Sequence, residues 1–126
     1  MSVRDIPKDR WCDELDTFSR QHEGWIVRVD VWGADGTPRT QARDLPLIGV
    51  SCDAPKSDTI AIMAGSRADD HLTHEIAGTV SVAIDETDAG AERGLRIRSA
   101  DGSETRVEFR SPMRSDEVDG MPHRSL

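Results

Sequence analysis

The sequence predicts a mainly β domain in which one N-terminal helix is followed by about six antiparallel strands. Apolar residues repeat with a helical period only over residues 8–22, and from Trp25 onward they alternate with a period of two. Leu, Ile, Val and Phe make up only about a fifth of the chain, too few to fill two full sheets. These observations favour a small bent barrel of the SH3-like or Sm-like kind, with a helix-capped open antiparallel sheet as the alternative.

The helix is predicted over residues 8–22, because its apolar side chains fall on a single stripe. The stripe comprises Trp11, Leu15, Phe18 and His22. Gly24 is expected to end the helix, since glycine readily adopts the left-handed conformation that follows a last helical turn. The apolar stripe would then cover an open face or end of the sheet.

Strands are predicted over residues 25–32, 40–52, 59–64, 76–84, 95–98 and 104–109. The second contains Pro46, which cannot donate to a strand ladder, so we expect a bulge or bend there. In the fourth, Val80 shares its parity with Ile84 and is expected in the core, with Gly78 as a kink. Residues 65–75 are expected to form a polar connection before that strand.

Two turns with the same Ala-Asp-Gly sequence are expected to differ in length. A two-residue turn at 35–36 keeps the apolar residues of the first hairpin on one face. In the last hairpin a three-residue loop over 100–102 is needed, and it places Leu95 opposite Val107. The predicted core consists of Trp11, Leu15, Phe18, Trp25, Val27, Val29, Ile60, Ile62, Val80, Val82, Ile84, Leu95, Ile97, Val107 and Phe109.

Residues 1–112 are expected to form a single domain, and residues 113–126, which lack periodicity, a flexible C-terminal tail. The chain has a net charge of −8, with most of the excess in its middle, which disfavours DNA and anionic membranes as partners. No apolar run could span a membrane and no signal-peptide core is evident, so we expect a cytoplasmic location. Cys12 and Cys52 are then expected to be reduced thiols.

A cluster of histidines and carboxylates precedes the fourth predicted strand. Asp70, His71 and His74 could bind a transition metal if this segment formed a turn of helix. On an extended strand the two imidazoles would point to opposite faces and could not share an ion. We expect His74 to be a half-buried, hydrogen-bonded side chain, with the metal site as the alternative.

The final hairpin carries the one basic surface predicted for this acidic chain. Arg96, Arg98, Arg106 and Arg110 share its outer face. Such a face is either solvated and balanced by acidic neighbours, or it docks an acidic partner, such as residues 69–92 of another copy. RNA ranks third, because this hairpin lacks aromatic residues placed for base stacking.

Trp32 is predicted to lie on the outer face of the first hairpin, beside a tight turn. An exposed tryptophan is a frequent interface anchor, and small domains often gain stability from a partner, so we expect a homodimer. The alternative is that the N-terminal helix or residues 113–126 cover Trp32 within one chain.

The sequence shows no nucleophile elbow, phosphate loop, dinucleotide fingerprint or paired-cysteine zinc pattern. Enzyme activity is therefore unsupported, and no cofactor is expected. The leading hypothesis is a non-catalytic binding or accessory module that acts through protein contacts. A metal-dependent enzyme or metal-binding protein that uses the His71 and His74 segment is the alternative, and RNA binding is third.

Several short motifs together carry a family resemblance. They are Trp11 with Phe18-Ser19-Arg20, His22-Glu23-Gly24-Trp25, Asp44-Leu45-Pro46-Leu47 with Gly49, Asp70-His71-Leu72-Thr73-His74 and Phe109-Arg110-Ser111-Pro112. The chain resembles a family of small uncharacterised bacterial and archaeal proteins over residues 6–112. This resemblance implies a self-contained domain, and it brings no assigned activity, cofactor or catalytic residue.

Overall fold

Eight β-strands and one α-helix make up residues 2–53, 58–66 and 71–110, the part of the chain that the computed structural model describes. The strands are β1 (Ser2–Ile6), β2 (Ile26–Trp32), β3 (Pro38–Cys52), β4 (Ile60–Ala64), β5 (Leu72–Ile76), β6 (Thr79–Glu86), β7 (Glu92–Ser99) and β8 (Glu104–Phe109). The helix α1 spans Trp11–His22 and follows a single 3-10 turn at Lys8–Arg10. The predicted tail over residues 113–126 lies outside the described residues.

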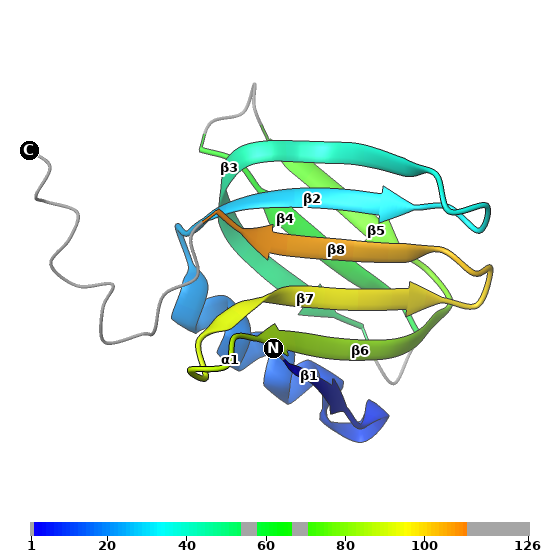
Figure 1. Ribbon diagram of the computed structural model, residues 1–126, viewed down its shortest axis with the longest axis horizontal. Coiled ribbons are helices and arrows are strands. Elements are labelled where there is room, and N and C mark those ends of the chain that lie inside the picture. Colours follow the sequence, from blue (N-terminus) through cyan, green and yellow to red (C-terminus); the bar gives the residue numbers. More distant parts are fainter. Residues whose placement is uncertain (1, 54–57, 67–70, 111–126) are drawn as a thin grey trace, which may run out of the picture.

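The strands form one antiparallel sheet in the order β1-β6-β7-β8-β2-β3-β4-β5. The long strand β3 connects its two parts, because residues 38–46 pair with β2 and residues 47–52 pair with β4. The predicted bend lies at the end of the first part, where the ladder is irregular between Ala42 and Leu45 and Asp44 has a φ of 57°. Figure 1 shows that β4 and β5 therefore lie behind β2 and β8.

The sheet is not closed, since β1 and β5 are its two edges in the described part of the chain. The helix α1 lies along one side of the bent sheet and packs mainly against β3 (Figure 1). The prediction of a mainly β domain with one N-terminal helix is thus confirmed. Of the two predicted architectures, the helix-capped open sheet is correct and the small barrel is not.

The core lies between the concave side of the sheet and α1. All four residues of the predicted helical stripe are buried there. Of the other predicted core residues, Trp25 is half-buried against the core and Val80 is 58% exposed. The remaining ones are buried, as predicted.

The prediction for Val80 fails because the predicted fourth strand is two strands, β5 and β6. Gly78, with a φ of 64°, turns the chain between them. Thr79 then lies opposite Ser99 and Ser81 opposite Arg98, so Val80 is the extra residue of a β-bulge. The bulge shifts the alternation by one residue and turns Val80 to solvent. The predicted polar connection over 65–75 likewise contains β5.

The two Ala-Asp-Gly turns have the same length, contrary to prediction. Each is a three-residue loop, closed by backbone hydrogen bonds from Gly33 to Thr37 and from Ser99 to Ser103. The last hairpin keeps the predicted register, with Leu95 opposite Val107. In the first hairpin the ladder skips Gln41, and this bulge returns the apolar residues of β2 and β3 to a shared face.

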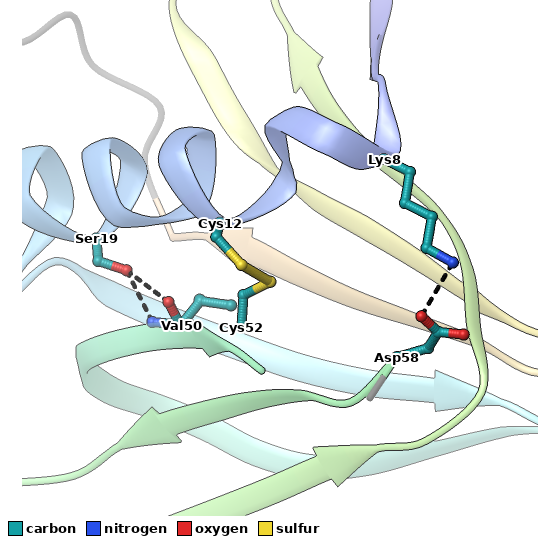
Figure 2. The surroundings of a disulfide bond; sticks show 6 residues. All are labelled: Lys8, Cys12, Ser19, Val50, Cys52 and Asp58. Atoms are coloured by element: carbon teal, nitrogen blue, oxygen red, sulfur yellow. Dashed lines mark hydrogen bonds and ion pairs between the residues drawn. A yellow bond between two sulfur atoms is a disulfide. The ribbon is translucent and has the colours of Figure 1, made fainter. Parts of the chain in front are cut away.

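Cys12 and Cys52 form a disulfide, so the prediction of reduced thiols is wrong (Figure 2). Their Cα atoms lie 5.2 Å apart, within the usual range for a disulfide. The bond ties the first turn of α1 to the end of β3. A second tie lies two helical turns further on, where the Val50 backbone N–H donates to Ser19 Oγ at 2.8 Å. Sequence periodicity alone does not reveal that these two elements are neighbours.

Candidate functional site

The outer face of β6, β7, β8 and β2 carries the predicted arginine residues, because alternate side chains of a strand point away from the core. Arg96 on β7 lies directly opposite Arg106 on β8. Arg98 lies opposite Glu104, one pair nearer the turn. Like charges in directly opposite positions are unfavourable unless carboxylates neutralise them. The sheet therefore concentrates positive charge at the centre of this face.

A hollow of about 410 Å³ lies on this face. It is lined by Asp85, Arg93, Arg96, Arg106, Glu108, Phe109 and Arg110. Gly94 lies opposite both Asp85 and Glu108, so no side chain fills the space between these two carboxylates. A Cβ at Gly94 would lie 1.9 Å from the Val107 carbonyl oxygen, so only glycine fits at this position.

Carboxylates of the same or a neighbouring strand hold three of the arginines in place. Arg96 Nε lies 3.0 Å from Asp85 Oδ1, and Arg98 Nε lies 3.1 Å from Glu104 Oε1. Arg106 Nε lies 2.5 Å from the other oxygen of Glu104. Burial alone would raise the pKa of Glu104, but the hydrogen bonds from the two arginines outweigh it and lower that pKa. Glu104 is therefore an ionised anchor for two guanidinium groups.

Trp32 lies at the edge of the same face, as predicted, and is half-buried. The Arg106 guanidinium stacks on its ring, with 4.6 Å between the guanidinium carbon and the ring centroid. In the described residues the ring is thus covered by an arginine of the same face. Beside it, buried Asp30 accepts a hydrogen bond from Thr40 Oγ1 at 2.7 Å and pairs with Arg28 Nε at 2.9 Å. These contacts connect β2 to β3 at the edge of the face.

The two histidines of the predicted metal site do not come together, because the chain forms the strand β5 here rather than a turn of helix. His71 is exposed just before the strand, and its Nε2 lies 3.0 Å from Thr73 Oγ1. His74 has the opposite parity and is half-buried, and burial lowers its pKa. Asp70 lies outside the described residues. Within those residues, no three His, Cys, Asp or Glu side chains are placed to hold one metal ion.

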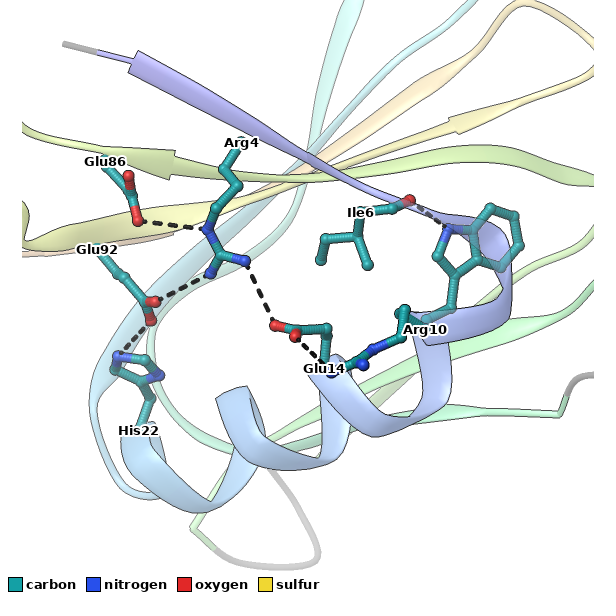
Figure 3. A network of polar contacts seen from close by, with 8 residues as sticks. Arg4, Ile6, Arg10, Glu14, His22, Glu86 and Glu92 are labelled. Carbon is teal, nitrogen blue, oxygen red and sulfur yellow. Dashed lines mark hydrogen bonds and ion pairs between the residues drawn. The ribbon is translucent and has the colours of Figure 1, made fainter.

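A polar network between β1, α1, β6 and β7 was not predicted from the sequence (Figure 3). The Arg4 guanidinium lies 3.4 Å from Glu14, 3.5 Å from Glu86 and 3.6 Å from Glu92. Glu92 also lies 3.3 Å from Nε2 of buried His22. The sequence feature that could have indicated this network is the charge of Arg4. Arg4 reaches its carboxylate partners only because β1 pairs with β6.

Burial displaces the pKa values of both members of the contact between His22 and Glu92. It lowers the pKa of His22, although a hydrogen bond to the Phe18 carbonyl opposes the shift, and it raises the pKa of Glu92. The His22 ring is further enclosed by Phe18, Trp25 and Phe109, with ring centroids 4.5 to 4.6 Å away. These contacts attach the end of α1 to the sheet, so we assign them a structural role.

A family model matches residues 2–118, nearly the whole chain. The chain belongs to DUF5335, a family of unknown function. This membership agrees with the expected family of uncharacterised domains, whereas the bacterial or archaeal origin stays a prediction. No curated protein and no solved structure matches the chain. None of the helices in the described part is long and apolar enough to cross a membrane.

Proposed function

We propose that this DUF5335 domain is a non-catalytic binding module that holds the carboxylates of an acidic protein segment. Its binding site would be the arginine face, which we define as the hollow lined by Arg93, Arg96, Arg106 and Arg110 together with neighbouring Arg98. The observation that carries the proposal is that four guanidinium groups and only two carboxylates line this one hollow on a chain of net charge −8.

Arginine suits this task because its planar guanidinium offers two parallel donors to the two oxygens of a carboxylate. The ion pairs with Asp85 and Glu104 are made through Nε of Arg96 and Arg106, and the proposal assigns the terminal nitrogens of both side chains to the ligand. The pairs also fix these side chains in advance, which reduces the entropy that a ligand must overcome. All but one of the residues that line the hollow are charged, which fits a protein surface better than a small apolar ligand.

RNA fits this face less well than an acidic protein does. Binding of single-stranded RNA relies on aromatic side chains on which successive bases stack. On this face Trp32 is already stacked by Arg106, so its ring is not free to stack on a base. RNA is therefore an outcome of the test rather than the proposed ligand.

Isothermal titration with a glutamate octapeptide tests the proposal, with a Gly-Ser octapeptide and a uridine octanucleotide as comparisons. We expect the glutamate peptide to bind at about 50 mM salt and to dissociate as salt screens the contacts. The Arg93→Ala/Arg110→Ala variant should bind about tenfold more weakly, which is the loss of about 1.4 kcal/mol. Arg39→Ala, on β3 outside the hollow, is the matched control. Equal binding by both variants, or tighter binding of the RNA, would contradict the proposal.

We also propose that the protein works in the cytoplasm, as its sequence suggested. Glutathione and thioredoxin keep most cytoplasmic thiols reduced, so in this location a large share of Cys12 and Cys52 should be present as free thiols in the cell. Alkylation of free thiols during cell lysis, followed by mass spectrometry of each cell fraction, provides the test. Recovery of the protein from an oxidising compartment would contradict the cytoplasmic location.

A further inference from the structure

We propose that two copies of this chain associate through the edge strand β5, with Thr73 of each copy at the twofold axis. This contact is independent of the arginine face. In the described part of the chain β5 pairs with β4 alone, so its other side offers backbone N–H and C=O groups to a further strand. The two strands would run antiparallel and join the sheets of both copies into one.

The other edge of the sheet is less suited to such pairing. The five residues of β1 include Arg4 and Asp5, and charged side chains on an edge strand oppose association with another strand. Arg4 is also bound to three carboxylates of its own chain. In contrast, β5 has Glu75 as its only acidic residue and no lysine, arginine or proline.

The alternation of side chains restricts the register of the new pair. The core faces of both copies stay on the same side only if opposite residues have the same parity. Full overlap of β5 gives a register centred on His74, and a shift by two residues gives one centred on Thr73 or on Glu75. The register centred on Glu75 sets two carboxylates directly opposite each other, which is unfavourable. A register centred on His74 sets two half-buried imidazoles against each other.

The register centred on Thr73 gives complementary pairs. It places Thr73 opposite Thr73, and hydroxyl pairs of this kind are favourable across strands. It also places exposed His71 of each copy opposite exposed Glu75 of the other, which brings an imidazole to a carboxylate twice in the dimer. The contact between His71 Nε2 and Thr73 Oγ1 indicates that both side chains already lie on this outer face. These pairs identify a second copy as the strand that fits this edge.

Sedimentation of the full chain over a range of concentrations provides the first test. A contact of one short strand is small, so we expect a reversible shift from 13.9 kDa toward twice that mass as concentration rises. Glu75→Lys should weaken association at least tenfold, and His71→Glu/Glu75→Lys, which restores opposite charges, should recover it. A mass of 13.9 kDa at every concentration, or no effect of Glu75→Lys, would overturn the proposal.

Cross-linking then tests the register. Under mild oxidation Thr73→Cys should give a covalent dimer, because the two introduced thiols would face each other across the axis. Val3→Cys, on the other sheet edge and 46% exposed, is the matched control and should stay monomeric. A dimer that forms through Val3→Cys, or one that Trp32→Glu abolishes while Glu75→Lys does not, would place the contact elsewhere and refute the inference.

Discussion

Removal of the Cys12–Cys52 disulfide is predicted to lower the free energy of unfolding by about 4 kcal/mol. The bond closes a loop between residues that are 40 positions apart. The chain-entropy relation for a loop of this length gives about 4 kcal/mol at about 25 °C, because the cross-link removes conformations of the unfolded chain. This is a large share of the roughly 5–15 kcal/mol typical of a small domain.

Urea unfolding monitored by tryptophan fluorescence measures this effect, since buried Trp11 lies next to Cys12. The native protein is compared with and without a reductant, and both are compared with Cys12→Ser/Cys52→Ser. We expect the reduced protein and the double variant to share a lower unfolding midpoint, and the reductant to leave the variant unchanged.

The matched control keeps the disulfide and removes the other tie between α1 and β3. Ser19→Ala deletes the hydroxyl that accepts the Val50 backbone N–H, and it should cost about 1–3 kcal/mol because that donor is left without its partner. A disulfide effect below about 1 kcal/mol would refute the chain-entropy reasoning for this loop. It would mean that residual contacts between the segments of α1 and β3 already restrict these residues in the reduced, unfolded chain.

Three further predictions concern stability. Gly94→Ala should cost more than about 3 kcal/mol in thermal unfolding, because its Cβ would overlap the Val107 carbonyl oxygen. Gly90→Ala, whose Cβ meets no atom and adds only the strain of a φ of 88°, should cost about 1–2 kcal/mol, and equal costs would exclude the clash as the cause. Phe18→Ala should cost about 3–5 kcal/mol, and a loss below about 1 kcal/mol would show that this buried ring is dispensable. Burial lowers the pKa of His22, so the unfolded chain binds more protons, and the free energy of unfolding should fall as the pH drops below about 6.5. His22→Gln should reduce this pH dependence, and an unchanged pH profile would contradict the assignment.

Local pattern was enough to predict the helix and the position of most strands. The helical stripe of α1 and the alternation in β4, β7 and β8 are properties of residues close in sequence, and their burial follows directly from them. The loop over 100–102 could also be predicted, because only a three-residue loop keeps Leu95 opposite Val107. The outward direction of Arg96 and Arg106 follows from the same alternation.

Features that depend on two distant segments could not be predicted in this way. A bulge changes the parity of a strand without a local signal, so Val80 was assigned to the wrong face. The first turn was predicted too short because an unpredicted bulge at Gln41 restores the register that the longer loop loses. In both strands the ladder with the neighbouring strand decides which residue is skipped.

The candidate site also combines features that the sequence predicts with features that only the folded structure determines. The common face of Arg96, Arg98 and Arg106 could be predicted, since alternation along β7 and β8 depends on the sequence of each strand alone. Arg93 was missed, because it has the opposite parity and lies at an irregularity where the ladder between β6 and β7 skips it. The hollow above Gly94, the ion pairs of Arg96 and Arg106 and the Cys12–Cys52 disulfide require the sheet order and the position of α1. Those contacts join segments far apart in the chain, and only the folded arrangement brings them within bonding distance.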